Sequence, residues 1–158
     1  MNPYQIITYP NEILNKTCEP VTEFGTEELR MIVQRMHATI KHRNSPGIGL
    51  AANQVGILKR IIVVNTLQKK AGGYLGALIN PEIISNDGDM KQEAEGCLSF
   101  PNQRYEVYRP QGIKVRFFNI DGQETVRSFK GITAICIQHE IDHLNGTTIA
   151  DVGSRVEK

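Results

Sequence analysis

The stretch that most constrains this chain lies at 132–145, where two histidines and a glutamate interrupt an otherwise apolar segment. His139 and His143 are four residues apart, and Glu140 directly follows the first of them. Residues four apart on an α-helix lie one turn above each other on one face, so both rings can bind a single metal ion. A carboxylate beside that ion can accept a proton from an attacking water. The pattern is therefore typical of hydrolytic metal sites.

The residues around the histidines predict that this helix is buried. Its histidine face continues a helical pattern that begins with apolar residues, at Ile132, Ile135, Cys136, His139 and His143. The other faces are apolar as well, and a helix that is apolar nearly all round normally lies at the centre of a domain. Ionisable groups buried there are costly unless they are paired or metal-bound. We therefore favour a metal site over two core histidines that bond to backbone carbonyls.

Length and charge limit the class of protein. A chain of 158 residues predicts a single domain, 1–158. With 18 basic and 17 acidic residues and no block of like charge, we expect neither nucleic acid nor a membrane as a partner. The sequence shows no signal-peptide pattern, and its three cysteines are widely spaced and odd in number. These features predict a cytoplasmic protein, which we expect to be a monomer.

The pattern of apolar residues predicts an α+β fold, with antiparallel β-sheets packed around the central helix at about 132–145. A second helix is expected from Thr26, which can cap it, to Ile40. Extended segments are expected at 60–65, 77–84, 113–117 and 123–129. Pro81 suggests an edge or a bend in the second of these. Asp121-Gly122 predicts a tight turn that joins the last two into a hairpin.

A hydrolytic metal site usually has three protein ligands and one open position. Common metalloproteases place the third ligand after the second histidine, often six residues on. That position is Ile149 here, so a protease is the weaker interpretation. Upstream, Cys97 in the stretch EGCLS at 95–99 offers a thiolate. One cysteine and two histidines suit a divalent ion such as iron, zinc, nickel or cobalt.

A third motif, GIGLAANQ, occupies 47–54. Its glycines allow the backbone to approach a ligand closely, but neither complete glycine pattern of a nucleotide-phosphate loop is present. We therefore discount nucleotide binding. The side-chain amide of Gln54 can donate a hydrogen bond to a carbonyl of a ligand.

The three motifs, in this order, resemble those of peptide deformylase. The resemblance spans nearly the whole chain and implies removal of the N-formyl group from the formyl-methionine of nascent polypeptides, with release of formate. It implies that one divalent metal, ferrous iron in this family with zinc, nickel or cobalt as substitutes, is bound by Cys97, His139 and His143. It also implies that Glu140 is the catalytic glutamate, and that the Gln54 amide and the Leu98 backbone N–H hold the formyl oxygen.

The resemblance extends to the peptide site. N-formyl-methionyl peptides would be the substrate, and the residues expected to bind them are Ile48, Gly49, Arg104 and Ile135. Taken singly, the two isoleucines are equally explained as core residues, and Arg104 as a solvated side chain. Asp142 and Arg109 are expected to support the metal ligands. A transient association with the ribosome would accompany this function, although only 12 residues follow Gly146, so we expect no extended C-terminal helix.

Two alternatives remain at this point. A structural protein whose metal only holds strands to the central helix would have four protein ligands and no need of Glu140. A peptide-bond protease would cleave internal bonds of unformylated peptides.

Overall fold

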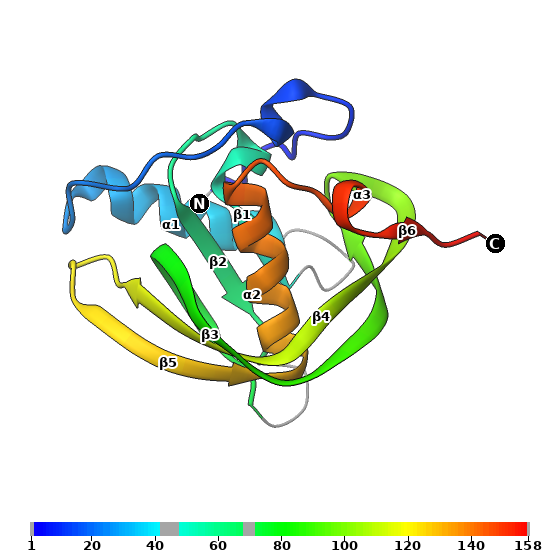
Figure 1. The fold of residues 1–158 in the computed structure, drawn as a ribbon. Helices are drawn as coiled ribbons and strands as arrows, with labels where there is room; N and C mark the ends of the chain where they lie inside the picture. The colour runs from blue at the N-terminus through cyan, green and yellow to red at the C-terminus, as the bar shows by residue number, and fades with distance from the viewer. Residues whose placement is uncertain (1, 42–47, 68–71, 158) are drawn as a thin grey trace.

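The computed structural model describes residues 2–41, 48–67 and 72–157 (Figure 1). Its elements, in chain order, are the 3-10 helix η1 (Glu12–Asn15), α1 (Glu27–Lys41), β1 (Gly49–Ala51), the 3-10 helix η2 (Ala52–Val55), β2 (Ile61–Asn65), β3 (Leu75–Cys97), β4 (Phe100–Phe118), β5 (Glu124–Lys130), α2 (Gly131–Leu144), α3 (Ile149–Val152) and β6 (Ser154–Arg155). The strand order in the described residues is β1-β2-β3-β4-β5, with β6 paired to β4, and these pairs are antiparallel. The predicted α+β class is confirmed, and the strands form one continuous sheet.

The central helix α2 lies within the curve of the sheet, as Figure 1 shows in orange. Ile137 and Leu144 are fully buried on it, as the apolar pattern predicts. The helix ends where Gly146 adopts a φ of 76°, a left-handed conformation that glycine adopts without strain. The helical pattern predicts that Ile132 is buried with the histidines, and this prediction is wrong. Ile132 is 43% exposed, because the first turn of α2 lines a cavity described below.

Strand β2 is a short run of β-branched residues that is buried on both faces. Side chains alternate across a strand, so Ile62 and Val64 face α2 while Ile61 and Val63 face α1. The helix α1 is capped as predicted, since the backbone N–H of Leu29 donates to Thr26 Oγ1 at 3.1 Å. The sheet therefore has a helix on each side of β2.

Strands β3 and β4 form a long hairpin that curls around α2 (Figure 1). The extended segment expected at 77–84 is correct in place but wrong in extent, because β3 continues to Cys97. Pro81 marks a bend, where the register with β4 shifts between Ile79 and Glu82. Further shifts follow before residue 97, and such bulges bend a strand pair. The second half of β3 is mostly exposed and polar, so its sequence carries little alternating apolar signal.

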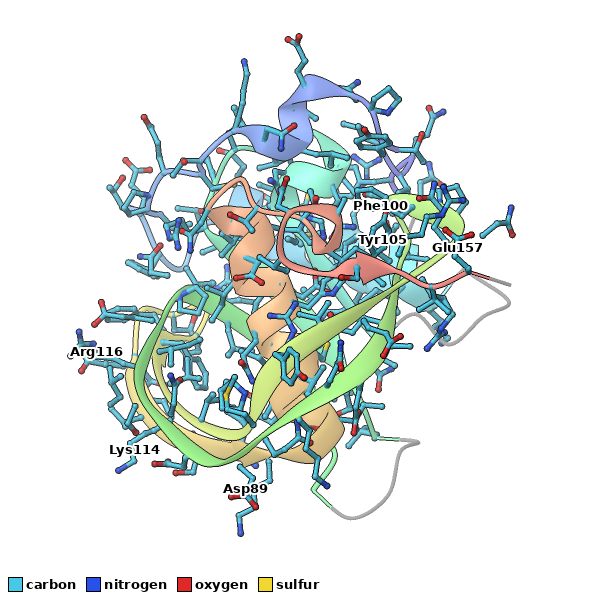
Figure 2. The ribbon with its side chains drawn as sticks, turned by 45° about the vertical axis from the view of Figure 1, so that its right-hand side comes forward. Asp89, Phe100, Tyr105, Lys114, Arg116 and Glu157 are labelled. Carbon is cyan, nitrogen blue, oxygen red and sulfur yellow. The ribbon has the colours of Figure 1, made fainter. Side chains whose placement is uncertain are left out.

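The remaining turns agree with the sequence pattern. Asp121-Gly122 lies between β4 and β5, and Gly122 has a φ of 85°. After α2, the described residues form the short α3 and β6. Phe100 and Tyr105 lie near the turn between β3 and β4, beside β6 (Figure 2), and their ring centroids are 5.9 Å apart. Figure 2 also shows Lys114 and Arg116, from farther along β4, and Asp89, from the middle of β3. No helix of the described residues is long and apolar enough to cross a membrane.

Candidate metal centre and active site

The three predicted ligands come together from two elements. Cys97 is the last residue of β3, and His139 and His143 lie one turn apart on α2. Their ligand atoms all lie within 4.8 Å of one another, and Cys97 Sγ is 3.3 Å from His143 Nε2. The curl of the hairpin is what brings β3 to the helix. A thiolate and two imidazoles at this spacing are a donor set that fits one divalent ion.

A buried network of charged side chains orients His139. Its Nδ1 lies 2.9 Å from Glu95 Oε1. Both oxygens of Glu95 accept hydrogen bonds from Arg109, at 2.6 and 3.0 Å, and Arg109 also pairs with Asp142 at 2.9 Å. Because a carboxylate held by a guanidinium is an acceptor, His139 Nδ1 carries a proton toward Glu95. Nε2 is then the ring nitrogen left for a metal ion, which would displace any proton on Nε2 when it binds. Arg109 and Asp142 therefore lie where the sequence predicts support for the ligands.

The same network shifts the pKa values of the glutamate and the two histidines at the site. Burial of Glu95 opposes its ionisation, but hydrogen bonds from His139 and Arg109 outweigh burial and lower the pKa of Glu95. Burial likewise opposes protonation of His139, yet the nearby Glu140, Cys97 and Glu95 raise its pKa well above the ordinary value. Burial, followed by the positive charges of His139 and Arg109, lowers the pKa of His143 well below its ordinary value. His143 is thus a neutral imidazole at neutral pH, the form that binds metals.

Glu140 lies beside this cluster and is only 5% exposed. Within the described residues its Oε1 atom is buried and has no hydrogen-bond partner. Burial raises the pKa of Glu140 to about 7, while His139 opposes that rise. A buried carboxyl with this pKa can both accept and release a proton near neutral pH. Glu140 lines the same cavity as Cys97 and His139, and its unpaired oxygen fits a site that holds a metal and a water.

Gln54 and Leu98, the predicted donors, flank Cys97. Leu98 and Ser99 form the two-residue turn that joins Cys97 of β3 to Phe100 of β4. Gln54 lies in η2, and its Nε2 is 3.6 Å from Cys97 Sγ. Both residues line the cavity that contains the cluster. The structure therefore places both beside the metal position.

This cavity has a volume of about 770 Å³, and the four residues predicted to bind the peptide all line it: Ile48, Gly49, Arg104 and Ile135. Gly49 is required by close packing, because a Cβ atom there would lie 2.5 Å from Cys136 Sγ and 2.8 Å from Glu140 Oε2. Arg104 is exposed at the cavity, and its Nη2 donates to the Ala94 carbonyl at 2.9 Å. Gly47 of the same motif lies outside the described residues.

Sequence reasoning missed the roles of three residues. The first is Glu95, whose motif gives no sign of its role, although it is two residues before Cys97 on a strand and so lies on the same face. Asn53, fully buried, donates from Nδ2 to the His143 carbonyl at 2.6 Å. Ser99, also fully buried, accepts from Gln54 Nε2 at 3.0 Å. No local pattern reveals the last two contacts, because each joins segments distant in sequence.

A curved antiparallel sheet around a helix that bears two histidines, with a cysteine from the sheet and a buried glutamate, defines a class of metal-dependent hydrolases. The family model described as "Polypeptide deformylase" matches residues 3–158. The chain therefore belongs to the polypeptide deformylase family and is a hydrolase that removes the N-formyl group from nascent peptides. The family is metal-dependent, and the Cys97, His139 and His143 cluster can hold the metal.

Individual relatives agree over nearly the whole chain. A peptide deformylase of Hydrogenovibrio crunogenus is 43% identical over 96% of this chain and 86% of its own length, and one of Afipia carboxidovorans is 39% identical over 98% and 88%. The crystal structure of peptide deformylase from Thermotoga maritima has a TM-score of 0.87 at 39% identity, covering 96% of this chain and 98% of that one. A Met-Ala-Ser-bound class I type b peptide deformylase from Acinetobacter baumannii has a TM-score of 0.86 at 32% identity, covering 95% and 98%.

Proposed function

We propose that Glu140, Gln54 and Leu98 carry out the deformylation beside one divalent metal held by Cys97, His139 and His143. The observation that carries this assignment is the buried Glu140 Oε1, which has no hydrogen-bond partner in the described residues and belongs to a residue that lines the same cavity as Cys97 and His139. A divalent metal bound there supplies Lewis-acid polarisation of the formyl carbonyl and lowers the pKa of a water. A thiolate with two imidazoles suits ferrous iron, which we propose as the physiological ion, with zinc, nickel or cobalt as substitutes.

Glu140 moves the proton of the reaction. Its carboxylate accepts the proton of the attacking water and then delivers it to the nitrogen of the departing amine. The pKa of about 7 allows both transfers near neutral pH. Burial excludes bulk water that would compete for this proton.

Gln54 and Leu98 hold the formyl oxygen. Gln54 Nε2 and the backbone N–H of Leu98 flank Cys97 in the cavity, where a carbonyl can accept from both. Donors that are already in place stabilise the negative charge that develops on this oxygen, and one such donor can contribute about 3 kcal/mol.

The cavity supplies the peptide site. Ile48 and Ile135 offer apolar surface for a methionine side chain, and Gly49 and Arg104 line the path for the rest of the peptide. An N-formyl-methionyl peptide is the substrate that this arrangement supports best. The relative from Acinetobacter baumannii with bound Met-Ala-Ser supports this view.

A purely structural metal is less well supported. Such a site is closed by four protein ligands, whereas the cluster within the described residues has three. We further propose that residues 1–158 act as one catalytic domain, because β2 packs against both helices. Because the substrate is a nascent polypeptide, we propose that the protein acts in the cytoplasm and associates transiently with the ribosome. We also propose that it acts as a monomer.

The role of Glu140 is tested with Glu140→Ala. Removal of the proton carrier is expected to lower kcat for formyl-Met-Ala-Ser by roughly 100-fold or more. Formate release is measured on anaerobically prepared protein, and metal content is measured on the same sample. Glu124→Ala, at an exposed position on β5, is the control and keeps its activity.

Full activity in Glu140→Ala would contradict the proposal that Glu140 carries the proton. Loss of the metal together with the activity would instead assign Glu140 a role in metal binding. The metal content of the anaerobic sample also tests the proposal of iron, which zinc as the main ion would contradict.

A further inference from the structure

Two short hydrogen bonds orient the Gln54 amide, beside its longer contact with Cys97 Sγ at 3.6 Å. The backbone N–H of Ala51 donates to Gln54 Oε1 at 2.9 Å, so the oxygen end of the amide points toward β1. The nitrogen end then points the other way, and Nε2 donates to Ser99 Oγ at 3.0 Å. Gln54 is 1% exposed and Ser99 is fully buried, so water does not replace either contact.

Ser99 can accept from Gln54 because its own proton is already used. Its Oγ donates to the carbonyl of Ile7 at 2.7 Å. A hydroxyl has one proton and two lone pairs, so this bond leaves Oγ to act as an acceptor toward Gln54. The chain of bonds thus runs in one direction, from the Gln54 amide through Ser99 to the backbone of residue 7.

Residues 7–9, here called the N-terminal strap, hold both partners. The backbone N–H of Ile7 donates to the Gln54 carbonyl at 2.8 Å, and that of Tyr9 donates to the Ser99 carbonyl at 2.9 Å. The ring of Tyr9 stacks on Phe100, with centroids 5.0 Å apart. The strap therefore joins η2 to the turn that carries Leu98, the two places from which the formyl oxygen is held.

We propose that Ser99 is a positioning residue, which together with the N-terminal strap aims the Gln54 amide at the formyl oxygen. The inference rests on the proposed role of Gln54. One Nε2 proton is held by Ser99, and the planar amide then directs the second proton into the cavity beside Cys97. Without Ser99 the amide keeps the Ala51 bond on its oxygen and only the longer contact with Cys97 Sγ, at 3.6 Å, on its nitrogen. The amide is then less firmly fixed about its terminal torsion, so the donor is present but misdirected.

The test is a double-mutant cycle of Ser99→Ala and Gln54→Ala, with formyl-Met-Ala-Ser as substrate. Ser99→Ala is expected to lower kcat roughly 10-fold, and Gln54→Ala roughly 100-fold, each with little change in KM. Because both act through one donor, Ser99→Ala in the Gln54→Ala background is expected to lower kcat no further. Ser99→Thr, which keeps the hydroxyl, is expected to recover most of the activity.

Thr39→Ala is the matched control. Thr39 is 1% exposed, accepts from the Tyr4 backbone at 2.7 Å and donates to the Arg35 carbonyl at 2.7 Å, so it anchors the same N-terminal segment away from the cavity. This variant is expected to lose thermal stability and to keep kcat. All variants are assayed at a temperature where far-UV circular dichroism shows them folded.

A second measurement does not depend on activity. Hydrogen exchange of the Gln54 side-chain NH₂ group, followed by NMR, is expected to accelerate in Ser99→Ala and to remain slow in Thr39→Ala. Unchanged exchange, wild-type kcat in Ser99→Ala, or independent effects in the cycle would each overturn the role of Ser99. Wild-type kcat in Gln54→Ala would instead overturn the proposed role of Gln54.

Discussion

At the scale of single residues, the metal ligands depend on groups that do not touch the metal position. His139 is oriented by Glu95, and the two carboxylate oxygens of Glu95 accept hydrogen bonds from Nε and Nη2 of Arg109. The carbonyl of His143 accepts from Asn53. Each ligand residue on α2 is thus bound by a buried polar partner from another element, His139 at its ring and His143 at its backbone carbonyl.

Glu95→Gln tests this support. The amide has the same size but no charge, so it pairs less well with Arg109 and with the Nδ1 proton of His139. We expect metal affinity to fall by roughly 10- to 100-fold, the usual cost of losing a partner behind a ligand. Competition with a metal chelator measures this change. Glu82→Gln is the control, since Glu82 also lies on β3 and pairs with an arginine of β4, Arg116 at 2.7 Å, but on the surface. Equal affinity in both variants would contradict the role of Glu95.

At the scale of elements, the C-terminal end of α2 is held on several sides. The last carbonyls of a helix have no partner within the helix, and a buried end requires others. Here the Leu144 carbonyl accepts from the Cys18 backbone at 2.8 Å and from Arg60 at 3.1 Å. Because His143 lies in this last turn, the cap also positions a metal ligand.

Gly146 allows the chain to leave this end of α2. A Cβ atom there would lie 2.5 Å from the Asn15 carbonyl oxygen, in addition to the strain of a left-handed conformation. Gly146→Ala is therefore expected to lower the free energy of unfolding by about 2–3 kcal/mol, whereas the conformation alone costs about 1 kcal/mol. Urea denaturation of the wild type and the variants measures the loss in free energy of unfolding. Gly25→Ala is the control, because Gly25 has a φ of 69° and nothing within 4 Å of its Cβ position. Equal losses in the two variants would show that the contact with Asn15 has no effect.

At the scale of the whole molecule, two apolar clusters share strand β2. One cluster lies between β2 and α1 and includes Met36, and the other lies between β2 and α2 and includes Ile137. Alternate side chains of a five-residue strand contribute to both. We therefore expect the two clusters to unfold together.

Met36→Ala tests this cooperativity. Met36 is fully buried, and its truncation leaves a cavity, so we expect a loss of about 2–5 kcal/mol. The transition is expected to remain single, with coincident curves from far-UV circular dichroism and tyrosine fluorescence. Met31→Ala, at a 45% exposed position of the same helix, is expected to change stability by less than about 0.5 kcal/mol. A second transition that Met36→Ala leaves unmoved would indicate two separate units.

Features that depend on neighbours within a helical turn or a strand follow from the amino-acid sequence alone. The four-residue spacing of His139 and His143 places both on one face of α2, and the apolar residues around them require that helix to be central. The turn at Asp121-Gly122 and the cap at Thr26 are equally local. The choice of Cys97 as third ligand came from the chemistry of its side chain and from a resemblance, because no spacing relates it to α2.

The path by which β3 reaches the helix, and the partners that lie behind the ligands, depend on the tertiary fold. Bulges after Pro81 curve a largely polar strand, and its exposed face has no apolar period that would predict its course. The hydrogen bond between His139 and Glu95 joins residues 44 apart in the sequence, and the one between Gln54 and Ser99 joins residues 45 apart. Such contacts follow from the path of the whole chain, because each needs two segments to arrive at one place with complementary donors and acceptors.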